Sequence, residues 1–167
     1  MRRLRDSGAD FAFRLGLTMR DSAAEALALA EFFDICDDEQ RRMLAFAGDQ
    51  RHFEPEAVVY QAGDVPLGAF VLINGMLKAQ PEGQIASYEI SEPGSVVSAM
   101  ALILAKPRPV TISAVTDCET LFIPRYAFIK LVQQSPELAQ RTVARVQQDL
   151  GNYLGALEPV RRRMKAD

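Results

Sequence analysis

The chain has 167 residues, of which 49% are hydrophobic, and a formal net charge of −3. This size and composition predict one soluble domain with a single core, and the acidic balance argues against nucleic acid or an anionic membrane as partner. The two cysteines, Cys36 and Cys118, form no CxxC pair, which is typical of a reducing compartment. We therefore expect a cytoplasmic protein without disulfides.

Residues 1–21 are predicted to form an N-terminal arm. No stretch of the sequence reaches the ~18 apolar residues that span a bilayer, so we expect no transmembrane segment. The arm contains five arginines and a period-two row of apolar residues, too often interrupted for a secretory signal. That row consists of Phe11, Phe13, Leu15, Leu17 and Met19. Two interpretations remain open: an arm that adds a strand or packs on a partner, and a surface anchor.

Two short helices should follow the arm. Residues 22–33 are rich in alanine, leucine and glutamate, which favour helix. A second start signal comes at Asp37, whose side chain can cap a helix together with Gln40. Gly48 is expected to end this second helix.

Between Arg51 and Ile123 the sequence consists of short runs of Val, Ile, Phe and Tyr separated by glycine and proline, which predicts many short strands. The strand candidates are residues 58–60, 69–73, 76–79, 85–90, 110–115 and 120–123, with a hairpin tip at residues 81–84. An all-β sandwich or barrel is the simplest arrangement of so many short strands.

The helical period returns after Pro124. Residues 125–134 predict a short helix, and Ser135-Pro136 starts a longer one. In the longer helix, apolar residues recur at alternating spacings of four and three, the a/d pattern of a coiled coil. This seam consists of Ala139, Val143, Val146, Leu150, Tyr153 and Leu157.

We predict that the last five seam residues form an interface with a second copy of the chain or with another protein. The alternative is that the first half of the seam packs on the chain's own barrel. Pro159 is expected to end or kink the helix. The domain would then cover residues 22–158, followed by a basic tail over residues 159–167.

Several local motifs fit one known family. Val58-Val59-Tyr60-Gln61-Ala62-Gly63-Asp64, Phe70-Val71-Leu72-Ile73-Asn74-Gly75 and Pro93-Gly94 occur in this order between the two helical parts. In these motifs and in the order of its elements, the chain resembles the cyclic-nucleotide-binding domain family, in particular the sensor domain of the catabolite activator type. The resemblance implies a mainly β fold: a cupin-like β-barrel (jelly roll), preceded by two short helices and followed by a short and a long helix.

The resemblance places the family's phosphate-binding cassette at Ser98-Ala99-Met100-Ala101-Leu102 and Lys106-Pro107-Arg108-Pro109-Val110-Thr111. It implies that Arg108 holds the phosphate, assisted by the first N–H groups of a helix over residues 99–105. The acidic residue that accepts a hydrogen bond from the ribose in the family is replaced by Ala99, and the hydroxyl residue after the arginine by Pro109.

At ~1.5–3 kcal/mol for each lost contact, these two changes lower the affinity for an ordinary cyclic nucleotide by roughly two to four orders of magnitude. Ser98 and Thr111 offer hydroxyl groups from new positions. The candidate ligand-binding residues are therefore Ser98, Ala99, Arg108 and Thr111.

The sequence argues against an enzyme and against a metal or other cofactor. His52 is the only histidine, so a metal centre would lack imidazole ligands, and neither cysteine has a neighbouring base. No helix-turn-helix follows the long helix in this sequence, so we expect no direct DNA binding.

Two functional hypotheses remain. The first is a stand-alone regulatory interaction module with a degenerate pocket, which joins a second copy or a protein partner through the long helix. The second is a small-molecule sensor that binds a cyclic nucleotide or another phosphate-containing ligand through Arg108.

Overall fold

The computed structural model describes residues 21–164, so residues 1–20 of the predicted arm lie outside the described part. A first helix covers residues 21–29 and is followed by the 3-10 helix η1 (Glu31–Ile35). The single helix predicted over residues 22–33 is therefore divided in two. Helix α2 (Asp38–Ala47) follows.

The predicted cap of α2 is confirmed. The Gln40 N–H donates to the Asp37 carboxylate at 2.7 Å, and the Asp37 N–H donates to the Gln40 side chain at 3.0 Å. These bonds satisfy two donors that the first turn of a helix otherwise leaves unpaired. The helix ends before Gly48, as predicted.

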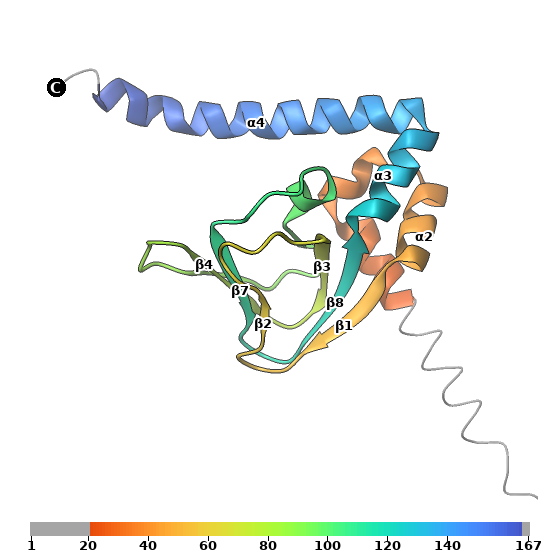
Figure 1. Cartoon of the computed structure of the whole chain (residues 1–167), viewed down its shortest axis with the longest axis horizontal. Helices are drawn as coiled ribbons and strands as arrows, with labels where there is room; N and C mark the ends of the chain where they lie inside the picture. Colours follow the sequence, from red (N-terminus) through yellow and green to blue (C-terminus); the bar gives the residue numbers. More distant parts are fainter. Residues whose placement is uncertain (1–20, 165–167) are drawn as a thin grey trace, which may run out of the picture.

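Within residues 21–164, eight strands form two antiparallel four-stranded sheets (Figure 1). One sheet has the order β1-β8-β3-β6 and the other the order β2-β7-β4-β5. The strands are β1 (Asp49–Phe53), β2 (Val58–Tyr60), β3 (Gly68–Asn74), β4 (Leu77–Pro81), β5 (Tyr88–Ile90), β6 (Val96–Val97), β7 (Val110–Ala114) and β8 (Cys118–Pro124). The expected mainly β jelly roll with flanking helices is confirmed.

Two of these strands, β1 and β6, were not predicted. Four of the five residues of β1 are polar, and its burial does not alternate, so the sequence gives no period-two signal. The strand forms because it pairs with β8 along its whole length, with Asp49 opposite Phe122 and Phe53 opposite Cys118. β6 has only two residues, too few to show any period.

The 3-10 helix η2 (Ala99–Leu102) separates β6 from β7, and two helices follow the barrel: α3 (Arg125–Gln134) and α4 (Pro136–Met164). In Figure 1, α4 runs across the top of the barrel and continues past it. The helix continues through Pro159, so of the two expected effects of this proline, an end or a kink, the end is wrong. None of the helices in residues 21–164 is long and apolar enough to cross a membrane.

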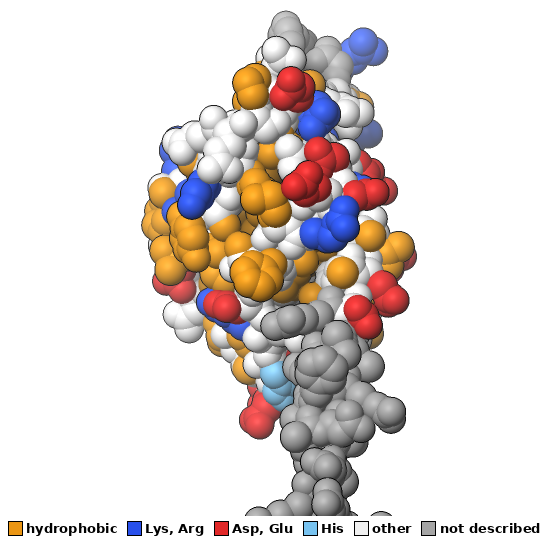
Figure 2. All heavy atoms as spheres, turned by 90° about the vertical axis from the view of Figure 1, so that its right-hand side faces the viewer, with side chains coloured by type: hydrophobic (Ala, Val, Ile, Leu, Met, Phe, Trp, Pro, Cys, Tyr) orange, Lys and Arg blue, Asp and Glu red, His pale blue; other side chains and the backbone are white. Residues whose placement is uncertain are grey.

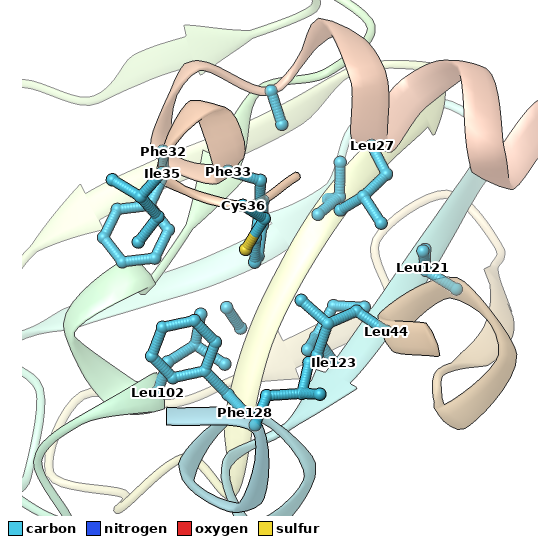
Figure 3. Close-up of a cluster of buried hydrophobic side chains, with 14 of the residues drawn as sticks. Leu27, Phe32, Phe33, Ile35, Cys36, Leu44, Leu102, Leu121, Ile123 and Phe128 are labelled. Atoms are coloured by element: carbon cyan, nitrogen blue, oxygen red, sulfur yellow. The ribbon is translucent and has the colours of Figure 1, made fainter. Parts of the chain in front are cut away.

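The larger core cluster joins the N-terminal helices and α3 to the sheet that contains β3 and β8 (Figure 3). Leu27, Phe33, Leu44, Ile123 and Phe128 are all nearly inaccessible to solvent. The rings of Phe33 and Phe128 meet edge to face, 6.5 Å apart between centroids. This cluster fixes the helices against one sheet, while a second cluster fills the space between the two sheets.

Gly94 allows the first helix to approach the barrel closely. Its φ of +89° is in the left-handed region, and a Cβ there would lie 2.6 Å from Leu29 Cβ. We expect Gly94→Ala to lower the free energy of unfolding by about 1–3 kcal/mol, measured by urea denaturation. Gly83, with φ +73° and no atom near a Cβ, is the matched control. An equal loss in Gly83→Ala would show that the contact with Leu29 contributes nothing.

Candidate functional site

A cavity of about 280 Å³ opens between the sheet that contains β2 and β7, strands β5 and β6, and η2. Three of the four predicted ligand-binding residues, Ser98, Ala99 and Arg108, line it. The lining consists of Tyr60, Tyr88, Ile90, Val96, Val97, Ser98, Ala99, Met100, Arg108, Pro109, Val110 and Ile112. Most of these side chains are apolar, and the polar ones come from β2, β5, the residue before η2 and the loop before β7.

Arg108 is held in place through its backbone. Its N–H donates to the Asp64 carbonyl at 3.0 Å, and its own carbonyl accepts from the Gly63 N–H at 2.8 Å. The side-chain Nε is buried and has no hydrogen-bond partner; no other buried side-chain N or O atom in the described part of the chain is left unpaired in this way. The guanidinium thus has one N–H donor that no acceptor in the described part of the chain satisfies.

Tyr60 and Ser98 close the cavity beside Arg108 through a hydrogen bond of 2.5 Å between their hydroxyl groups. Ser98 has a φ of 60°, a strained backbone for a residue other than glycine, which is often found at binding sites. Burial raises the pKa of the Tyr60 hydroxyl, while the bond to Ser98 and the nearby Arg108 act in the opposite direction. Tyr60 therefore offers a neutral hydroxyl to the cavity.

Sequence reasoning identified Tyr60 only as a strand residue. Strict alternation places Val58 and Tyr60 on the same face of β2. The structure shows an irregularity in the β2–β7 register between these two residues, with Val58 largely exposed and Tyr60 buried. Nothing in the sequence predicts this bulge. The only indication that Tyr60 belongs to the site was that it is an aromatic residue with a hydroxyl group, shortly before the turn at Gly63.

Ala99 begins η2, which has four residues instead of the predicted helix over residues 99–105. Ala101 and Leu102 are buried in the core and fix this short turn. Arg125, the first residue of α3, donates from Nε to the Ala101 carbonyl at 2.6 Å and also bonds to the Pro66 carbonyl. The start of α3 is thereby tied directly to the segment that lines the cavity.

Thr111 is placed differently from the other predicted residues. Its Oγ1 accepts the Ala62 N–H at 3.0 Å, next to the turn at Gly63. It is not among the residues that line the cavity. The structure therefore gives Thr111 a role in holding the β2 end of the site.

A second cavity, of about 530 Å³, adjoins the first and reaches α4. Both cavities are lined by Tyr88, Ile90, Val96 and Ala99. On α4 the second cavity is bordered by Arg145 and Asp149, whose side chains form an ion pair at 3.2 Å.

Two arginines position α4 over this region. Arg145 Nη1 donates to the Glu31 carbonyl at 3.0 Å, and Arg141 Nε donates to the Ile35 carbonyl at 2.6 Å. α4 is thus fastened to η1 beside the adjoining cavities.

The predicted seam of α4 points away from these contacts. Leu138 and Thr142 are buried against the rest of the domain, whereas Val143 and Leu150 are exposed and Val146 is half-buried. The side chains of Tyr153 and Leu157 lie outside the described part of the structure.

The cysteines and the histidine lie away from the cavity. Burial raises the pKa of the Cys36 thiol to about 11. Cys118 is buried at the start of β8, and His52 pairs with Asp117 at 3.2 Å on the surface. Among the described residues, no group of three His, Cys, Asp or Glu side chains could hold a metal ion.

The sequence profile described as "Cyclic nucleotide-binding domain" matches residues 50–135, just over half of the chain. This span contains the barrel except the first residue of β1, together with η2, Arg108 and α3. The chain therefore belongs to the cyclic nucleotide-binding domain family.

Known relatives agree with this assignment. The chain is 30% identical over 100 residues to the HTH-type transcriptional regulator Cmr of Mycobacterium tuberculosis, a match that covers 59% of this chain and 41% of that protein. The chain thus spans about two fifths of that regulator.

Solved structures show the same fold at 18% identity. The sensor domain of the transcriptional regulator DNR from Pseudomonas aeruginosa matches with a TM-score of 0.67, over 81% of this chain and 93% of that one. The catabolite activator protein of Thermus thermophilus matches with a TM-score of 0.61, over 77% and 62%. These relatives are regulators by name.

Proposed function

We propose that this domain is a non-enzymatic regulatory module whose cavity binds a phosphate-containing small molecule through Arg108. The observation that carries the proposal is the buried Arg108 Nε without a partner in the described structure. A buried donor left unpaired costs about 1–3 kcal/mol, and a phosphate oxygen beside it would remove that penalty with a charge-assisted hydrogen bond.

The apolar wall and the hydroxyl groups of the cavity suit the base and the sugar of a nucleotide. Tyr88, Ile90 and Val96 give both cavities an apolar wall against which a base can pack, and the Tyr60 and Ser98 hydroxyls lie beside Arg108. The regulatory role is inferred from the relatives, which are transcriptional regulators. The buried free cysteines support the cytoplasm as its place of action.

The affinity for cyclic AMP and cyclic GMP should be weak. The family's cassette has an acidic residue at the position of Ala99, and the half-buried methyl group present here cannot accept a ribose hydroxyl. Pro109 has neither a hydroxyl nor an N–H to donate. The cavity therefore retains the phosphate contact of Arg108 and lacks a side-chain acceptor at position 99.

Calorimetric titration of the wild-type chain tests the proposal. Cyclic AMP, cyclic GMP and a cyclic dinucleotide are compared with adenosine, which has the sugar and base of cyclic AMP without its phosphate. We expect a saturable heat for at least one phosphate compound and none for adenosine. The absence of a binding heat for all three phosphate compounds at millimolar concentration would overturn the proposal for these ligands.

Restoring an acidic residue should restore affinity for cyclic nucleotides. Ala99→Glu is expected to tighten cyclic AMP binding about ten- to a hundredfold, since a carboxylate that accepts a hydroxyl contributes ~1.5–3 kcal/mol. Ala99→Gln is the matched control, because it has the same shape without the charge and should gain less. Equal affinities of wild type and Ala99→Glu would show that position 99 does not face the sugar.

A second part of the proposal concerns α4. Val143 and Leu150 expose 56% and 55% of their surfaces on the side of the helix that carries the predicted seam. Exposed apolar side chains in a row along one helix are typical of a partner interface. We infer that α4 joins two copies of the domain, or the domain and another protein.

A further inference from the structure

An apolar surface on the opposite side of the molecule takes no part in the site. A groove of about 300 Å³ runs between α2 and α3, lined by Met43, Leu44 and Ala47 from α2 and by Tyr126, Lys130 and Leu131 from α3. Met43 and Ala47 also border a second hollow of about 580 Å³ that extends along α2 past Phe46. We call these two connected hollows the α2–α3 apolar surface.

Large side chains on this surface are unusually exposed. Phe46 exposes 85% of its surface, Tyr126 74% and Met43 47%. In Figure 2, which shows the face with the N-terminal helices and α3, hydrophobic side chains gather in the middle of the face. Single exposed apolar residues are ordinary, but three large ones on the α2–α3 apolar surface indicate that something covers it.

The chain contains a segment with matching chemistry. In residues 11–19, Phe11, Phe13, Leu15, Leu17 and Met19 alternate with polar or small residues. In an extended backbone, residues with this spacing all point to the same side. The segment would then present one continuous apolar face about 26–30 Å long, enough to cover α2, whose ten residues span about 15 Å.

The position of this segment in the chain favours the same molecule as its partner. The first helix lies beside α2, since Ala24, Leu27 and Ala28 share a hollow with Asp38 and Arg41.

The described chain begins at the start of this first helix, drawn in red in Figure 1, near the end of α2 that passes into β1. Met19 is only two residues before Asp21, so a segment tethered this close has a local concentration on the order of millimolar.

The rim of the surface is mixed in charge. Glu39 and Arg42 border it on α2, and Lys130 borders it on α3. Arg14, at an even-numbered position of the segment, and Arg20, directly after the segment, would point away from the groove, next to solvent. Apolar area therefore provides the match, and no arginine of the segment needs to be buried.

We propose that residues 11–19 dock in an extended conformation along the α2–α3 apolar surface of the same chain. In this state the segment covers Phe46 and Tyr126, and it competes with any other protein for that surface. The proposal is independent of the ligand cavity and of the seam on α4.

Limited digestion with trypsin of the full chain tests the docking. The Arg14–Leu15 bond lies in the middle of the segment, and a docked segment has to leave the surface before the protease can bind it. We expect the double variant Phe46→Ser/Tyr126→Ser to be cleaved at this bond at least tenfold faster than wild type. The rate of cleavage is measured by mass spectrometry of the fragments. Ile85→Ser is the matched control, because Ile85 is fully exposed on the hairpin between β4 and β5.

A second variant, with substitutions in the segment instead of the groove, separates loss of docking from a folding defect of the domain. Phe11→Ser/Leu17→Ser leaves the described domain unchanged and should accelerate cleavage by a similar factor. Equal cleavage rates in wild type and both double variants would overturn the proposal. Protection that disappears over a roughly hundredfold dilution would assign the docking to a second copy and overturn the intrachain contact.

Discussion

Arg108→Ala is expected to lower the affinity for a phosphate-containing ligand by about 1.5 to 3.5 orders of magnitude, since truncating one partner of a buried charge-assisted pair costs ~2–5 kcal/mol. The large effect follows from the position of the residue. Arg108 lines the cavity and its Nε is buried without a partner, so we expect the ligand to be that partner. Calorimetric titration of wild type and variant with the same ligand measures the ratio of affinities.

The fold should survive this change. The two hydrogen bonds that hold Arg108 use its backbone N–H and carbonyl, which alanine retains. Removing a buried donor without a partner should also leave thermal stability unchanged or slightly higher.

Arg108→Lys is the matched control: it keeps the charge and loses the planar fork, so it should bind with intermediate affinity. Equal binding by wild type and Arg108→Ala would place the ligand elsewhere.

The sequence predicted those features whose causes are local. The Asp37–Gln40 cap depends on two side chains three residues apart, and α3 depends on its own periodicity after Pro124. Arg108 and Ala99 were found through the resemblance of the cassette, and both line the cavity.

Features caused by distant parts of the chain were missed. β1 has a polar sequence and becomes a strand because β8 offers it a row of hydrogen-bond partners. Tyr60 faces the cavity because the register shifts between Val58 and Tyr60, a change that depends on pairing with β7. The expected helix over residues 99–105 stops after four residues, where Ala101 and Leu102 enter the core.

The continuous course of α4 was also missed, although no contact with a distant part of the described chain explains it. A proline within a helix removes one hydrogen bond and disfavours the preceding turn, which is why Pro159 suggested an end. The structure keeps α4 helical to Met164. The helix is thus longer than its contacts with the domain require: Arg141 and Arg145 fasten its first part to η1, and Leu150 beyond them is exposed.

That exposed part of α4 carries the second large prediction. Leu150→Glu is expected to weaken a dimer formed through the seam by more than ~10³-fold, because a symmetric interface loses two buried leucines, at ~1.5–3 kcal/mol each, and gains two facing carboxylates. Analytical ultracentrifugation should show dimers for wild type and monomers for the variant.

The matched control for this experiment is Gln148→Glu. It adds the same charge to the same exposed helix, but position 148 lies about 160° around the helix from Leu150. A dimer that breaks in Leu150→Glu and persists in Gln148→Glu would identify the seam as the interface. If both variants keep the oligomeric state of wild type, the seam is not the contact. The exposure of Leu150 would then carry no argument for a dimer, since single exposed apolar residues are ordinary.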